Sequence, residues 1–131
     1  YLETNVKENN SSVKPVMADA LEICKTFADG ELDLIVSNPP YIKSADIETL
    51  QKEVRLEPRL ALDGGEDGCD FYREIVSRWS RKLKKGGALA FELGENQADA
   101  VKALMTDKGF SDFKISLDFG GVQRAIIGTL L

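Results

Sequence analysis

Residues Leu32–Ile42 read LDLIVSNPPYI and hold the most informative pattern of the chain. Its first five residues, Leu32 to Val36, are apolar or β-branched apart from one acid, which predicts a buried strand. Two prolines follow at positions 39 and 40, and because they lack the N–H groups that a sheet needs, the strand must end before them. Pro39 also keeps Asn38 in an extended conformation. We therefore expect a rigid tip at the carboxyl end of a strand, which is where open α/β sheets bind ligands.

The tip carries a specific set of polar groups. Asn38 supplies an amide, the carbonyl of Pro39 is a second fixed acceptor, and Tyr41 offers a flat apolar face with a polar end. Two acceptors beside an aromatic face suit a planar NH2 group, such as a carboxamide or the exocyclic amine of a base. A plain proline turn is the alternative. Asn-Pro-Pro-Tyr directly after an apolar strand resembles the signature of S-adenosylmethionine-dependent methyltransferases acting on planar nitrogens, and this context favours the functional interpretation.

Composition excludes several classes of protein. The 131 residues are 43% hydrophobic and 30% charged, which is typical of one globular domain. A net charge of −5 disfavours a non-specific nucleic-acid binder. Cys24 and Cys69 lie far apart, which favours a reducing, cytoplasmic setting, and no apolar run predicts a membrane span. Histidine is absent, which excludes Ser-His-Asp and Cys-His catalysis, and we predict no metal site.

The rest of the chain alternates between strand and helix patterns. The predicted strands are Val13–Ala18, Ala88–Leu93, Phe113–Asp118 and Arg124–Leu130. The predicted helices are Ala20–Phe27 after Asp19, Ala45–Val54 after Ser44, Asp70–Lys84 and a helix from Asn96 to Lys108. Gly86-Gly87 is expected to end the third helix, and its basic end, residues 81–85, is expected to be solvated. Together these patterns predict a doubly wound α/β domain whose last two strands pair antiparallel.

Two features keep alternative interpretations open. Asp19 is either a helix N-cap or a contact to a cofactor, and one carboxylate can do both. The glycine-rich acidic loop Asp63–Gly68 is either a flexible connector or a loop on the substrate side. It lacks the strand that precedes a phosphate-binding loop, and its acids would repel phosphate.

Further residues along the chain extend the resemblance to the HemK/PrmC family, whose members methylate the glutamine side-chain amide in the Gly-Gly-Gln motif of peptide-chain release factors. The matching positions are Asn38–Ile42, Glu53-Val54-Arg55, Glu57-Pro58, Ala61-Leu62, Gly65, Gly68, Tyr72, Glu92, Gly94, Gln97, Asp118, Gly120 and Arg124. The resemblance implies a partial Rossmann-like class I methyltransferase fold with a mostly parallel sheet and an antiparallel last strand. It also implies the strand order 32–36, 88–93, 124–130, 113–118.

The same resemblance assigns candidate roles. The catalytic tip would be Asn38, Pro39, Pro40 and Tyr41, with Asn38 and the Pro39 carbonyl holding the substrate amide. Glu53, Arg55, Glu57 and Pro58 would complete the substrate pocket, and Asp19 together with Asn38 would contact the cofactor, S-adenosylmethionine.

The resemblance further implies that residues 1–131 are the C-terminal portion of a methyltransferase domain, without its first two strands and without the N-terminal domain that recognises the substrate. We therefore expect activity in the longer parent protein, with release factors as partners and no direct nucleic-acid or membrane contact. The alternatives are an adenine or guanine amino-methyltransferase and a non-catalytic interaction domain. Because the missing strands would leave residues 32–36 with a bare edge, we expect self-association, or cover from a rearranged Val13–Ala18 segment.

Overall fold

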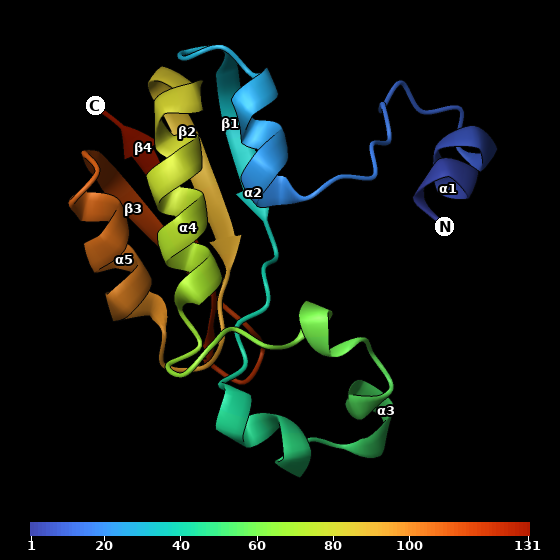
Figure 1. Cartoon of the computed structure of the whole chain (residues 1–131). Helices are drawn as coiled ribbons and strands as arrows, with labels where there is room; N and C mark the ends of the chain where they lie inside the picture. Colours follow the sequence, from blue (N-terminus) through green and yellow to red (C-terminus); the bar gives the residue numbers. More distant parts are fainter.

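The strand that leads to the Asn-Pro-Pro-Tyr tip forms one edge of a four-stranded sheet (Figure 1). This computed structural model describes residues 1–131. Its strands are β1 (Leu32–Ser37), β2 (Leu83–Glu92), β3 (Phe110–Leu117) and β4 (Gln123–Leu130). They lie in the order β1-β2-β4-β3, which confirms the predicted order.

The expectation of a mostly parallel sheet is wrong. Only β1 and β2 pair in parallel, whereas β4 pairs antiparallel with both β2 and β3. The reason is that β4 lies between β2 and β3 and runs opposite to both. The predicted antiparallel pairing of the last two strands is therefore confirmed, but two of the three strand pairs are antiparallel.

The helices that pack on the sheet cover one of its faces (Figure 1). The α-helices are α1 (Leu2–Glu8), α2 (Ala20–Ile23), α3 (Lys52–Arg55), α4 (Asp70–Trp79) and α5 (Ala98–Thr106). Short 3-10 turns cover Cys24–Thr26, Ser44–Thr49, Arg59–Ala61 and Ser80–Lys82. Helices α2, α4 and α5 lie side by side on the sheet, whereas α1 lies apart from it with no buried residue. None of the helices combines the length and hydropathy that a bilayer span requires.

The core lies between these helices and the sheet. The rings of Tyr72 on α4 and Phe91 on β2 meet edge to face, with centroids 5.2 Å apart, and both side chains are fully buried. Leu89, Val101 and Met105 surround them and are also fully buried. This cluster places the apolar face of α4 against the sheet and holds β2, whose carboxyl end lies at the site.

The opposite face of β1 is uncovered, so the prediction of a buried strand is only half right. Ile35 packs against the core, but Leu34 and Val36 point the other way and are 54% and 69% exposed. Successive strand residues face opposite sides, and no helix of the described chain covers the second side.

Three other segments differ from the prediction. Val13–Ala18 is not a strand, because Pro15 lacks an N–H and the segment pairs with no strand. The predicted helix 45–54 is a 3-10 turn followed by α3, because the chain is extended at Leu50 and the Ser44 hydroxyl donates to Asp63 rather than capping a helix. Strand β2 begins before the Gly86-Gly87 pair, at Leu83.

The basic run 81–85 also differs from the prediction. The ammonium of Lys82 is buried, donates to the carbonyl of Phe27 at 2.7 Å and pairs with Asp29 at 2.6 Å. That contact lowers the pKa of the Asp29 carboxyl. Lys82 therefore ties the chain before β1 to the end of α4.

The packing of β2 predicts a large difference between two identical substitutions. Leu89→Ala removes a fully buried side chain and should lower the free energy of unfolding by about 2–5 kcal/mol. Leu56→Ala removes a side chain that is 86% exposed and should change it by about 0.5 kcal/mol or less. Urea unfolding of both variants measures the difference, and equal losses would contradict this packing.

Candidate functional site

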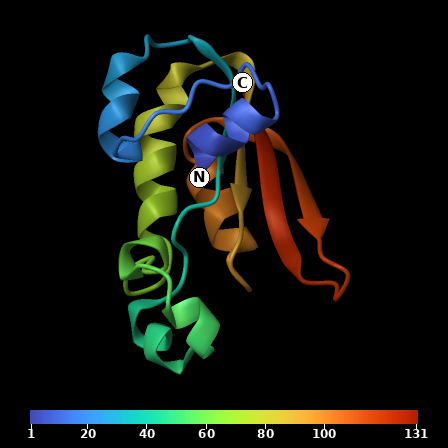
Figure 2. The same cartoon turned by 90° about the vertical axis from the view of Figure 1, so that its right-hand side faces the viewer.

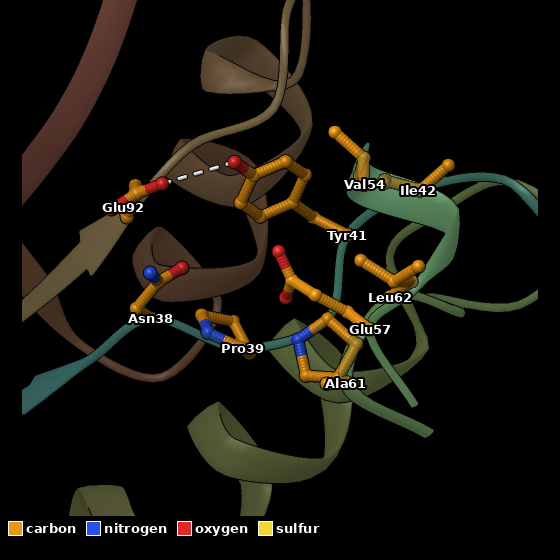
Figure 3. Close-up of a pocket in the computed structure, with 10 residues that line it drawn as sticks. Asn38, Pro39, Tyr41, Ile42, Val54, Glu57, Ala61, Leu62 and Glu92 are labelled. Atoms are coloured by element: carbon orange, nitrogen blue, oxygen red, sulfur yellow. Dashed lines mark hydrogen bonds between the residues drawn. The ribbon is translucent and has the colours of Figure 1, made fainter. Parts of the chain in front are cut away.

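The tip and the end of β2 form one wall of a cavity because β1 and β2 are parallel and end at the same edge of the sheet. Val36 pairs with Ala90 and Ser37 with Phe91, which brings Asn38 beside Glu92 (Figure 3). The cavity has a volume of about 440 Å³. Its lining residues are Asn38, Pro39, Pro40, Tyr41, Ile42, Val54, Glu57, Ala61, Leu62 and Glu92.

Tyr41 is fixed across the top of this cavity. Its hydroxyl donates to Oε1 of Glu92 at 2.9 Å (Figure 3). Partial burial, together with this hydrogen bond, raises the pKa of the Tyr41 phenol above its usual value. The hydroxyl of Tyr72 donates to the backbone carbonyl of Glu92, also at 2.9 Å, and holds the strand end in place. Tyr41 therefore presents a neutral ring in a defined orientation.

The cavity combines an acidic and an apolar side. Glu57 points into it from the segment after α3, and Glu92 lies at the end of β2 (Figure 3). Ile42, Val54 and Leu62 form the apolar side. No Lys or Arg is among the lining residues. Such a cavity favours neutral or cationic ligands and disfavours phosphate.

A second cavity, of about 480 Å³, lies beside the first. Its lining residues are Val36, Ser37, Asn38, Ala90, Phe91, Glu92, Arg124 and Ala125. Asn38 and Glu92 line both cavities. The guanidinium of Arg124 pairs with Asp118 at 2.9 Å, which lowers the pKa of that carboxyl. Two ligands in the two cavities would therefore meet at Asn38.

The structure brings together some of the predicted site residues and not others. Asn38, Pro39, Pro40, Tyr41 and Glu57 line the first cavity. Glu53, Arg55 and Pro58 do not line this cavity and are exposed. They belong to α3 and the segment after it, and α3 lies beyond the carboxyl end of β1 (Figure 1). Arg55 instead lies 3.6 Å from Glu48.

Asp19 is a helix cap in this structure. Its carboxylate accepts from the backbone N–H of Leu21 at 2.8 Å, which confirms the N-cap interpretation. The residue is exposed and stays outside both cavities. Helix α2 begins at the same end of the sheet at which β1 ends (Figures 1 and 2).

The loop Asp63–Gly68 packs against the tip rather than forming a free connector. Gly64 donates its N–H to the carbonyl of Ile42 at 2.8 Å, and a Cβ on Gly64 would lie 2.8 Å from Cα of Tyr41. Asp63 accepts from Ser44 at 2.6 Å and from Gly65 at 3.0 Å, and these contacts lower the pKa of its carboxyl. The loop therefore braces the backbone of Tyr41 and Ile42.

Sequence reasoning gave no role to Glu92, although the structure places it beside the tip. A signal existed: Glu92 lies at the end of a predicted strand, and the ends of neighbouring parallel strands meet. Val54 and Leu62 are among the positions of the family resemblance, but no local pattern assigned them to the tip, because long-range packing brings them there.

Comparison with curated proteins finds release factor glutamine methyltransferases. That of Geobacter sulfurreducens is 50% identical over 105 residues, which are 79% of this chain and 37% of the relative. That of Clostridium acetobutylicum is 40% identical over 128 residues, which are 96% of this chain and 42% of the relative. The chain thus spans less than half the length of these curated relatives. No family profile matches the chain.

Solved structures agree with this result. The release-factor-specific protein-(glutamine-N5) methyltransferase of Alicyclobacillus acidocaldarius is 27% identical, with a TM-score of 0.51 over 84% of this chain and 54% of that one. A methyltransferase from Pyrococcus furiosus has a TM-score of 0.68 at 23% identity, over 97% of this chain and 54% of that one, and supports the fold alone. The α/β fold is structurally similar to class I methyltransferases. In sequence, this chain is homologous to part of the release factor glutamine methyltransferases.

Proposed function

We propose that this chain provides the reaction centre of an S-adenosylmethionine-dependent enzyme that methylates the glutamine amide in the Gly-Gly-Gln motif of peptide-chain release factors. The observation that carries the proposal is the pair of cavities that meet at Asn38. A two-substrate transfer needs such a meeting point. Residues 1–131 are, in this proposal, the C-terminal portion of the methyltransferase domain, and the complete protein is the active form.

The first cavity is the proposed place of the substrate amide. The side-chain oxygen of Asn38 and the carbonyl of Pro39 accept its two N–H groups, and Tyr41 packs beside its plane. Glu57 and the apolar residues Val54 and Leu62 complete the pocket. In this proposal Glu53, Arg55 and Pro58 act further out, on the release factor around the glutamine. With both N–H groups held, the remaining electron density of the nitrogen points at the electrophile, so catalysis is mainly alignment. As the amide takes the methyl group, it would release one N–H proton to solvent.

The residues present fit a cationic methyl donor. S-adenosylmethionine, when bound, supplies a methyl group on a positively charged sulfonium. The Glu92 carboxylate lies where the cavities meet and attracts positive charge, while Arg124, the one cation that lines the second cavity, is paired with Asp118. In this proposal Asn38 would contact the cofactor, and the exposed carboxylate of Asp19 would accept from its adenine amine.

The acidic cavity favours a protein substrate over a nucleic acid. Two carboxylates and no cation line the first cavity, whereas a polynucleotide carries a negatively charged phosphate on every nucleotide. Methyl transfer to a release factor, compared with transfer to oligonucleotides, separates the two substrate classes.

Asn38→Ala tests the first role. In the complete protein, loss of the amide acceptor should lower turnover of release factor about 10²–10³-fold, because it removes a group that positions the nucleophile, and should cause only a small loss of cofactor affinity. Radiolabelled methyl transfer measures turnover, and calorimetry measures affinity. Asn5→Ala, on the exposed helix α1, is the control. Near-normal turnover of the Asn38→Ala variant would show that Asn38 does not position the nucleophile.

Two substitutions at Asp19 separate capping from cofactor binding. Asp19→Ala should cost about 0.5–2 kcal/mol of stability, whereas Asp19→Ser keeps an N-cap and should cost little. Both substitutions should raise the Kd for S-adenosylmethionine, because both remove the carboxylate. Thermal unfolding and calorimetry give the two quantities. If Asp19→Ser binds the cofactor as tightly as the unaltered protein, Asp19 is a cap alone.

We also propose that the 131-residue chain self-associates through β1. The outer edge of β1 pairs with no strand of the chain, and Val13–Ala18 does not cover it. Such an edge is a template for another strand, and lysine on an edge strand blocks this pairing. Val36→Lys should therefore yield a monomer, whereas Val13→Lys, at an exposed residue outside the sheet, should not. Sedimentation velocity measures the mass, and a monomeric unaltered chain contradicts the proposal.

A further inference from the structure

The side chain of Gln97 joins three segments around the tip. Its Oε1 accepts from the backbone N–H of Gly94 at 3.0 Å. Its Nε2 donates to the carbonyl of Tyr41 at 2.9 Å and to the carbonyl of Gly68 at 3.3 Å. The residue is 8% exposed. One buried amide thus connects the segment after β1, the loop before α4 and the segment after β2.

Glycines make room for this amide. A Cβ on Gly68 would lie 2.6 Å from Nε2 of Gln97, and a Cβ on Gly94 would lie 2.5 Å from its Oε1. The same Cβ on Gly94 would lie 2.9 Å from the ring of Tyr41. Gly68 also has a φ of +78°, which disfavours any side chain. The site is therefore shaped around Gln97 and Tyr41 together.

Only an amide satisfies all three partners. The contacts need one acceptor and a nitrogen with two donors, which is the Gln side chain. A Glu carboxylate would place an oxygen against two carbonyls, and a Met would leave an N–H and two carbonyls without a partner. Gln97 lines neither cavity, so its influence on them passes through the segments that it holds, of which the one with the Tyr41 carbonyl belongs to the tip.

We propose that Gln97 is a positioning residue that fixes the carbonyl of Tyr41 and thereby holds Asn38, Pro39 and the Tyr41 ring in their reactive arrangement. This inference rests on the proposed function. It predicts a loss in the rate of transfer that exceeds any loss in binding, because a tip displaced by about 1 Å lowers the rate about 10²-fold.

The experiment compares Gln97→Met with Gln123→Met, an exposed residue on β4, in the complete protein. Gln97→Met should lower kcat for release factor methylation about 10–100-fold, while KM for the release factor and Kd for the cofactor change less than about threefold. It should also lower the raised pKa of Tyr41, because a displaced ring loses part of its burial and its hydrogen bond to Glu92; NMR of labelled tyrosine measures this. Gln123→Met should change none of these values. A folded Gln97→Met protein with unchanged kcat and an unchanged Tyr41 pKa would overturn the proposal.

A second measurement needs no variant and no activity. In the unaltered protein, the Nε2 protons of Gln97 should exchange with solvent much more slowly than those of the exposed Gln51 and Gln123. Equal exchange would overturn the positioning role. Slow exchange, together with a lowered Tyr41 pKa in Gln97→Met, supports it even if no methyl transfer is found, and in that case only the proposed function fails.

Discussion

The parallel pairing of β1 with β2 is the constraint on which the site depends. It makes the two strands end at one edge of the sheet, so that Asn38 after β1 lies beside Glu92 at the end of β2. The strands are held there by the core, where Tyr72 and Phe91 pack edge to face, and Tyr72 also binds the carbonyl of Glu92. The same residues thus stabilise the fold and align the cavity.

The elements that follow the tip complete the site by packing on it. The segment from Ser44 to Leu62 supplies the apolar wall of the first cavity. The loop Asp63–Gly68 packs against the backbone of Tyr41 and Ile42. Neither segment is a long regular helix or strand. Their conformation depends on specific contacts, such as the hydrogen bond from Ser44 to Asp63 and the glycines that let the loop approach the tip.

Local chemistry made some parts of the structure predictable and others not. The end of β1 was predictable because two prolines cannot continue a sheet, and the core face of α4 because its apolar residues recur with helical spacing. The exposure of Leu34 and Val36 was not, since it depends on which face of the sheet is covered. The burial of Lys82 was also missed, because its partners Phe27 and Asp29 lie more than fifty residues away in sequence.

The two carboxylates of the first cavity also bear on the end of a catalytic cycle. In the proposed reaction the donor enters with a positive charge and leaves as a neutral thioether, while the methylated amide becomes neutral once its proton is lost. Glu57 and Glu92 attract a cation more strongly than a neutral molecule. In the proposed reaction the site would therefore hold the fresh donor more tightly than the spent one, and this difference in affinity would favour exchange of product for substrate after each turnover.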